Sequence, residues 1–431
     1  MNLGMCHPDL RAMASSVGRK GSKGLYPHVK WNYVSMLFSE EFWNMGNDLF
    51  ELLSSTKHCY ATNPRDKIFA LIGLAGDKTF GIRPNYNKTK SVVFTEFALN
   101  VISETRNLKV LNYSDVEDPN DEERLPLWAP RWQHEATPGY CDMSLFGFKS
   151  SNGLELNLES SINTQVLPLN GLYVDQVKES YAQDIKPDLN CMAIGSMVTN
   201  QRRLLKHQYG LDMIRAIALT MIKGRTLLLY ADTECKRPTD DSYLNAFTAF
   251  AFRSFVASFV KIDDGERYQK AILQLIKMAI DARPPISQND PDWDRPGLRK
   301  FVNDKLAHLH PDSMETVSSY MEVLGRMPCD IEDFLTFAQD FGYSCHRKFF
   351  ITGKGYIGTG PRSLEPGDFV CILFGGDTPY IVRQRPSASD EYLFLGTTYV
   401  HGIMEGEAIT TWQEQKDSQD PKFQERLFKL I

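Results

Sequence analysis

The chain has 431 residues, of which 42% are apolar and 24% charged, and 48 basic against 54 acidic side chains give a net charge of −6. This composition is typical of a globular protein of two or three domains, and it excludes collagen and small disulfide scaffolds. The mild negative charge also argues against nucleic acid as a partner, because proteins bind its phosphates with a surplus of Lys and Arg.

The cysteines and the apolar stretches indicate a protein of the cell interior. No two of the eight cysteines form a Cys-x-x-Cys pair, and several lie in apolar surroundings such as Val370-Cys371-Ile372, which is typical of reduced, buried thiols. The longest apolar helix candidate, Ala246 to Val260, carries Arg253 and is shorter than the roughly 20 residues that cross a bilayer. We therefore expect a cytoplasmic protein without a secretory signal or a membrane span.

Helices are predicted first along the chain. Apolar residues at spacings of three and four predict one or two short helices between Tyr33 and Leu53. Asn63-Pro64-Arg65-Asp66 predicts a helix start, with a capping amide, a proline at the first position and a carboxylate at the third. A buried helix is expected to follow and to be stopped by Gly73 and Gly76. A second amphipathic helix is predicted from the positions Val93, Phe94, Phe97, Ala98, Val101 and Ile102.

Three segments without helical periodicity come next. Leu108 to Leu111 is a candidate strand, and Ser114 to Glu123, with six acidic residues, is typical of a solvated loop at a domain boundary. In Leu125 to Trp132, two prolines exclude a regular element, while Trp128 and Trp132 require burial. We expect this last segment to cross a hydrophobic groove.

The remaining pattern predicts strands on either side of a helical middle. Val166 to Val177 suggests strands broken at Gly171, and Cys191 to Gly342 is mainly helical. Short β-branched and aromatic runs from Phe349 to Val400, separated by turn residues, predict a small antiparallel sheet or barrel. We predict an α+β fold in which the strands of Val166 to Val177 join this C-terminal sheet across the helical insertion.

Two clusters have a chemical and a structural interpretation. Gly353-Lys-Gly355-Tyr-Ile-Gly358 matches a dinucleotide-binding loop, but no helix opens after it to bind a pyrophosphate, so a glycine-rich β-hairpin is favoured. His401, Glu405 and Glu407 suggest acid/base or metal chemistry, including a hydrolase as a further alternative. A strand-ending turn at Gly402 and Gly406 that leads into a short helix is favoured over both.

Arg65 and Asp66 also have both a ligand-binding and a structural interpretation. They lie where a helix N-terminus would present them to a ligand. The favoured alternative is structural, with Asp66 as a helix cap and Arg65 as its solvated neighbour.

Four blocks of the chain resemble those of fungal heterokaryon-incompatibility (HET) domain proteins. Residues 58–77, which contain Asn63-Pro-Arg-Asp-Lys-Ile-Phe-Ala-Leu-Ile-Gly-Leu-Ala75, are similar to the family block C-D-P-R-D-K-I-Y-A-L-L-G-L-A. Ile82 to Val93 resembles I-x-P-D-Y-S with its following helix, and Leu125 to Trp132 resembles L-P-S-W-x-P-D-W. Pro366 to Gly376 and Tyr399 to Ala408 together resemble the C-terminal signature of the family. Asn63, Arg131 and Glu405 depart from the family's usual Asp but keep a polar surface or capping role.

The resemblance implies a particular organisation. The α/β effector region with which family members begin has no counterpart before Thr56, so we expect a truncated member to which no effector activity can be transferred. The predicted parts are a helical leader (1–55), the C-terminal part of a HET-like region (56–135), a strand pair with a helical middle (136–345) and a C-terminal β-subdomain with a short helix (346–431).

The resemblance further implies a role in incompatibility and programmed cell death through protein recognition or regulation, with a protein partner, no cofactor and no metal. The alternative is an accessory or small-molecule-binding protein of a biosynthetic gene cluster, which would use the C-terminal barrel. The motif residues expected to serve structure or recognition, none of them catalytic, are Asn63, Pro64, Arg65, Asp66, Trp128, Trp132, Gly367, Asp368, His401, Gly402 and Glu407.

Overall fold

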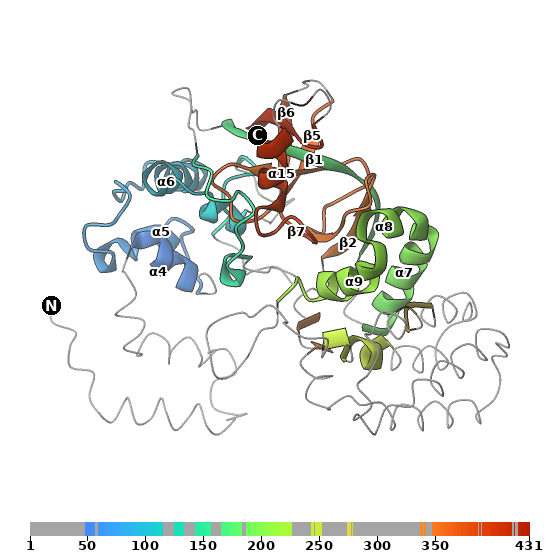
Figure 1. Cartoon of the computed structure of the whole chain (residues 1–431). Helices are drawn as coiled ribbons and strands as arrows, with labels where there is room; N and C mark the ends of the chain where they lie inside the picture. The colour runs from blue at the N-terminus through green and yellow to red at the C-terminus, as the bar shows by residue number, and fades with distance from the viewer. Residues whose placement is uncertain are drawn as a thin grey trace, which may run out of the picture. The chain divides into compact units, whose positions relative to one another are not determined.

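A computed structural model describes residues 48–56, 59–114, 125–132, 143–156, 165–182, 187–225, 347–386, 388, 390–415, 418 and 421–431, with short helical pieces between 243 and 341. The chain divides into two compact units (Figure 1). Unit 1 comprises Met1–Glu104 and Arg131–Ala136, and unit 2 comprises Thr105–Pro130 and Thr137–Ile431. The acidic loop at 115–123, residues 33–47 and most of the expected helical middle lie outside the described residues. The four-part division proposed from the sequence stays a prediction.

Unit 1 contains the helices α4 (Leu49–Ser55), α5 (Asp66–Phe69) and η1 (Ile72–Leu74), and nearly all of α6 (Lys90–Thr105). The prediction for α6 is confirmed, since all six of its expected core positions are buried. The mostly buried helix expected before Gly73 and Gly76 is divided into the short helices α5 and η1, and Leu74, expected on its buried side, is exposed. Glycine favours this division because it is a poor helix former, and Gly73 lies inside η1.

An aromatic cluster forms the core of unit 1. The ring centroid of Phe97 in α6 lies 6.0 Å from that of Phe80 and 6.2 Å from that of Trp132. The ring centroid of Phe50 in α4 lies 6.4 Å from that of Trp132. The expected burial of Trp132 is therefore confirmed. In each of these pairs the edge of one ring packs against the face of the other, the arrangement that aromatic pairs prefer.

The helices of unit 2 are mostly in the middle of the chain. They are η2 (Lys109–Tyr113), η3 (Met143–Phe146), α7 (Pro187–Asn200), α8 (Arg202–Tyr209), η4 (Gly210–Asp212), α9 (Met213–Met221) and α15 (Glu407–Gln415). The strand expected at Leu108 to Leu111 is wrong, because these residues enter the 3₁₀ helix η2. The side chain of Asn107 accepts the backbone N–H of Lys109 at 3.1 Å and so starts a turn where a strand would need an extended backbone.

One sheet contains the described strands of unit 2. They are β1 (Leu167–Ala182), β2 (Lys348–Thr352), β3 (Ile357–Gly360), β4 (Phe369–Leu373), β5 (Tyr380–Gln384), β6 (Glu391–Thr397), β7 (Tyr399–Val400) and β8 (Gln424–Leu430). Their order is β4-β5-β6-β8-β1-β2-β3-β7, and a further β4–β1 pairing closes β4, β5, β6, β8 and β1 into a ring. Only β6 and β8 pair in parallel among these strands. The predicted α+β fold with a barrel-like, largely antiparallel sheet is confirmed.

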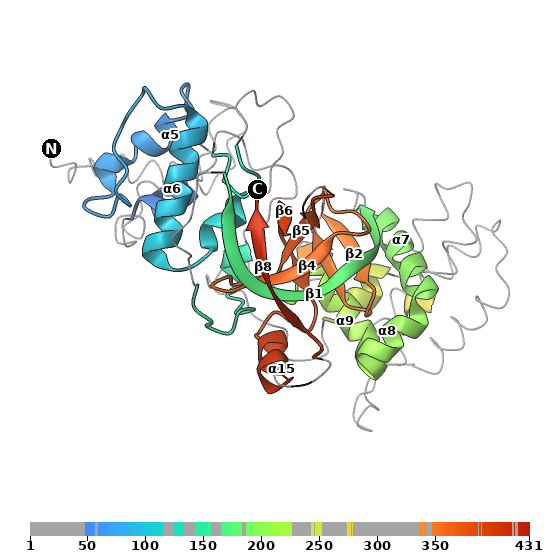
Figure 2. The same ribbon diagram turned by 90° about the horizontal axis from the view of Figure 1, so that it is seen from above.

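The long strand β1 pairs with three other strands of this sheet, β2, β4 and β8. Figure 2 shows it curving past β8, β4 and β2. Gly171 is the register partner of both Leu373 in β4 and Arg426 in β8. The prediction that residues 166–177 join the C-terminal strands is therefore confirmed, but the predicted break at Gly171 is wrong. Glycine is needed there because a Cβ atom would overlap with the carbonyl oxygen of Ile372.

Apolar side chains fill the described part of the ring. Leu172 of β1, Ile372 of β4 and Ile381 of β5 have no exposed surface and belong to one core cluster. A second cluster joins α9 to Phe349 and Ile357 of β2 and β3. The ring thus encloses a packed core in the part that the structure describes, as is typical of small closed sheets.

The glycine-rich segment at 353–358 is a hairpin, as predicted. β2 and β3 pair antiparallel on either side of it. The buried carboxylate of Asp175 accepts the N–H of Lys354 at 2.5 Å, and the N–H of Gly353 donates to Gln176 at 2.9 Å. The backbone groups that would hold a pyrophosphate in a dinucleotide loop therefore bind β1 instead.

Substituting Gly171→Ala should destabilise unit 2, because the added Cβ must displace the β4 backbone. We expect a loss of about 1–3 kcal/mol in the free energy of unfolding, measured by urea denaturation followed by far-ultraviolet circular dichroism. Gly73→Ala is the matched control, since nothing lies within 4 Å of its Cβ position. Equal stability of the two variants would contradict the proposed close approach at Gly171.

Candidate functional site

The Asn63-Pro64-Arg65-Asp66 motif forms the turn that leads into α5. The side-chain oxygen of Asn63 accepts both the backbone N–H and the Nε of Arg65, each at 3.1 Å. This amide serves the turn as a cap does. Asp66 is the first residue of α5, and its carboxylate accepts from the Tyr86 hydroxyl and not from a backbone N–H of the helix, so its predicted role as a helix cap is wrong.

Arg65 holds the loop that precedes α6. Its Nη1 donates to the carbonyl oxygens of Tyr86 at 2.6 Å and Lys88 at 2.7 Å, and its guanidinium carbon lies 5.4 Å from the centre of the Tyr86 ring. The Tyr86 hydroxyl donates to Asp66 at 2.6 Å, and this hydrogen bond raises the pKa of Tyr86. We call these four residues the Arg65 clasp. Arg65 thus binds the backbone of this loop, and the prediction that it is a solvated neighbour of the cap is wrong.

Lys67 ties the segment before the motif to α5. Its buried ammonium donates to the carbonyl oxygens of Thr56 at 3.1 Å and Cys59 at 2.5 Å. Burial lowers the pKa of Lys67, because removal from water disfavours its charged form.

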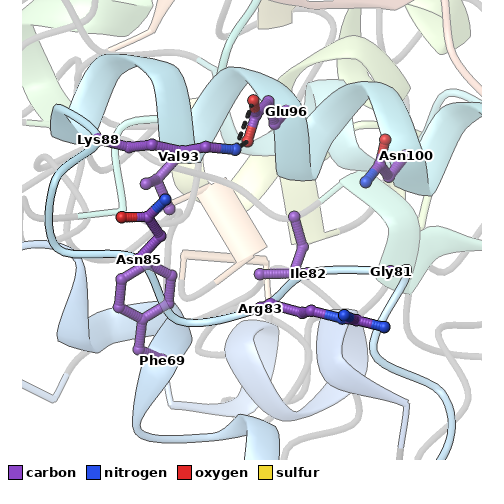
Figure 3. Close-up of a pocket in the computed structure, with 9 residues that line it drawn as sticks. All are labelled: Phe69, Gly81, Ile82, Arg83, Asn85, Lys88, Val93, Glu96 and Asn100. Carbon is purple, nitrogen blue, oxygen red and sulfur yellow. Dashed lines mark hydrogen bonds and ion pairs between the residues drawn. The ribbon is translucent and has the colours of Figure 1, made fainter.

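A cavity of about 430 Å³ lies next to the clasp, between the 81–88 loop and α6 (Figure 3). Lys88 and Glu96 form an ion pair of 2.7 Å along its α6 side. Asn100 donates to the carbonyl oxygen of Phe80 at 2.8 Å and fixes the start of the loop. Arg83 and Asn85 extend from the loop, and Phe69 of α5 contributes an aromatic wall. None of these residues was a candidate from the sequence, since their spacing follows no binding motif.

Trp128, the first tryptophan of the 125–132 segment, is fully buried in unit 2. Its indole nitrogen lies 3.4 Å from the carbonyl oxygen of Gln165, and its own carbonyl accepts the Ser114 hydroxyl at 2.6 Å. The segment has no helix or strand in the structure, which confirms the interpretation of its prolines.

The Gly367-Asp368 turn anchors β4 to β1. Gly367 has a φ of +99°, which a glycine adopts without strain, and its N–H donates to Val177 at 2.8 Å. The buried carboxylate of Asp368 binds Arg383 at 2.7 Å and accepts the N–H of Glu365 at 2.7 Å. Both motif residues are therefore parts of the sheet framework.

His401, Glu405 and Glu407 each have a different partner. The Nδ1 of His401 lies 3.1 Å from the Tyr399 hydroxyl, Glu405 pairs with Arg225 at 2.6 Å, and Glu407 accepts the N–H of Glu405 at 2.8 Å. The chain turns at Gly402 and enters α15 at Glu407, which confirms the predicted turn and short helix. The three side chains do not converge on one reacting position.

Tyr209 and Arg225 complete this C-terminal cluster, and sequence reasoning missed both. Tyr209 packs edge-on against His401 at 5.6 Å, accepts the N–H of Ile357 at 3.0 Å and donates to the carbonyl of His401 at 3.2 Å. Burial raises its pKa. Both residues come from the helical middle, far from His401 in sequence, so no local pattern could pair them.

In the described part of the chain, no three His, Cys, Asp or Glu side chains are grouped so that they could hold a metal ion. Within the same residues, the structure has no helix of the length and apolar character that spanning a bilayer requires.

Substituting Arg65→Gln should weaken unit 1, because two loop carbonyls lose a charged donor. We expect a loss of about 1–2 kcal/mol in the free energy of unfolding, measured by urea denaturation, and faster amide exchange in residues 86–88. Arg83→Gln is the matched control on the same unit and should change stability by less than about 0.5 kcal/mol. Equal effects of the two substitutions would show that the clasp contributes nothing specific.

Two comparisons relate the chain to known proteins. The Het-6 beta-barrel domain family matches residues 333–418, which include β2 to β7 and α15. Heterokaryon incompatibility protein 6, OR allele, of Neurospora crassa is 26% identical over 402 residues, which cover 85% of this chain and 52% of that protein. The chain thus spans about half the length of this curated relative. No solved structure matches it.

The residues that match the family do not contain the whole ring. Two of its strands, β1 and β8, lie outside the matched residues. The match to the Neurospora protein covers most of the chain. By these two matches, the chain is similar to fungal heterokaryon-incompatibility proteins.

Proposed function

We propose that this protein acts in fungal incompatibility and programmed cell death by recognising or regulating a protein partner, and not by catalysis. The name of the Neurospora crassa relative, an incompatibility protein, supports the biological setting. The mode of action is inferred from the surface of unit 1 and from the roles of the motif side chains.

The exposed hydrophobic residues of unit 1 carry this proposal. Among the residues that the structure describes, five large hydrophobic side chains are exposed, and four of them lie between positions 60 and 92. Tyr60 is 76% exposed and Tyr86 55%, while Leu74 and Val92 are less so. Exposed tyrosines are typical of protein interfaces, since the ring buries a large area at little cost in conformational entropy.

The motif side chains support the same interpretation because they bind within the chain. Arg65 donates to loop carbonyls, Asp368 binds Arg383, and Glu407 accepts a backbone N–H. These contacts explain the motif residues as parts of the framework of their own unit, and on unit 1 Arg65 and Asp66 hold the exposed Tyr86. The alternative, a small molecule bound inside the C-terminal ring, is not favoured by the apolar side chains that fill its described part.

A viability assay tests the proposal. The full chain is expressed in a filamentous fungus, and dead cells are scored with a vital dye after hyphal fusion. We expect the double variant Tyr60→Ser, Val92→Ser to abolish the effect of the chain, because it removes interface area without touching the core. Leu211→Ser, at an 89% exposed position of unit 2, is the matched control and should keep the effect.

Two further variants distinguish recognition from chemistry. His401→Gln and Glu405→Gln should leave the viability effect unchanged if the protein acts by recognition. Loss of the effect in these folded variants, together with full effect of the double variant on unit 1, would overturn the proposal in favour of a reaction at the C-terminal cluster.

A further inference from the structure

The unpaired polar groups in the unit 1 cavity are mainly hydrogen-bond donors. Among the described residues, the guanidinium of Arg83 has no hydrogen-bond or ion-pair partner. The side-chain oxygen of Asn85 accepts the N–H of Asn87 at 2.9 Å, which leaves its amide nitrogen as an unused donor. A ligand that satisfied both groups would have to supply acceptor oxygens.

The charges of the lining favour a ligand with a single negative charge. Lys88 contacts both carboxylate oxygens of Glu96, at 2.9 and 2.7 Å, so these two charges compensate each other. Arg83 is then the uncompensated charge of the cavity lining. Because Arg83 is the one charge of the described lining without a counter-charge there, a ligand with a single negative charge would neutralise it, whereas a dianion would bring an excess negative charge.

Phe69 and Val93 lie toward one end of the cavity and the Arg83 guanidinium toward the other. Figure 3 shows Phe69, Asn85 and Val93 toward one end and Gly81, Asn100 and the guanidinium of Arg83 toward the other, with Ile82 between them. The volume of about 430 Å³ falls in the range of roughly 300–1,000 Å³ that small-molecule sites occupy.

From these observations we propose that the cavity between the 81–88 loop and α6 binds a small organic carboxylate with a flat apolar body. The carboxylate accepts from the Arg83 guanidinium, which matches its two oxygens in geometry. The apolar body packs against Phe69, Ile82 and Val93. This site is independent of the proposed protein partner, which contacts exposed side chains outside the cavity lining.

Titration calorimetry on the full chain tests the site with 2-naphthylacetate as the probe. We expect one saturable site for the carboxylate and at least about tenfold weaker binding of the uncharged 2-naphthylacetamide. Naphthyl phosphate and inorganic phosphate form the other arms, and both should bind more weakly than the carboxylate.

Three substitutions assign the site to the cavity. Arg83→Gln should weaken binding about tenfold, since it removes the charged donor. Asn85→Asp should also weaken it, because the new carboxylate repels the ligand while keeping the acceptor for Asn87. Glu96→Gln should strengthen binding severalfold, because Lys88 loses its counter-charge. This gain is not expected from a purely structural role of Glu96.

Arg362→Gln, at an exposed arginine of unit 2, is the matched control and should leave affinity within about twofold. Thermal melting of each variant confirms that it is folded. The proposal is overturned if the folded wild-type chain shows no saturable binding of the carboxylate, if Arg83→Gln and Arg362→Gln bind it equally, or if a phosphate probe binds more tightly.

Discussion

Unit 2 depends on the backbone hydrogen bonds that β1 makes with strands near the far end of the chain. β1 pairs with β2, β4 and β8, and its pairing with β4 closes the five-strand ring. The edge strand of a sheet leaves N–H and C=O groups unpaired. Because β1 pairs with three strands, it provides hydrogen-bond partners for the edges of all three. Gly171 makes this possible at the point where β4 and β8 both approach it. The Gly367-Asp368 turn and the carboxylate of Asp175 then hold the neighbouring loops to the same strand.

The sequence predicted those features that depend on local pattern. The apolar spacing of α6, the turn chemistry around Gly402 and the β-branched runs after Phe349 each determine local structure, and the structure confirms them. Gly171 misled the prediction because glycine commonly ends a strand, whereas here it allows two backbones to approach. The Arg65 clasp and the Tyr209 contact with His401 could not be predicted, since both join residues that are distant in sequence.

Most motif side chains of this chain bind other groups of the chain itself. Arg65 and Asp66 bind one loop, Asp368 binds Arg383, and Glu407 begins α15. Side chains that are fixed in this way hold the surface around them in one arrangement. On unit 1, that surface exposes Tyr60 and Tyr86. A protein that recognises a partner needs such a fixed surface, because ordering it on binding would lower the affinity.

Native-state hydrogen exchange, resolved by residue, tests most directly whether β1 belongs to the C-terminal sheet. The ring predicts that the amides of Leu172 and Tyr173 in β1 exchange with the same opening free energy as those of Ile372 in β4 and Phe428 in β8, and respond equally to denaturant. Exchange of the β1 amides by a separate opening of much lower free energy, while β4 and β8 stay protected, would contradict the account.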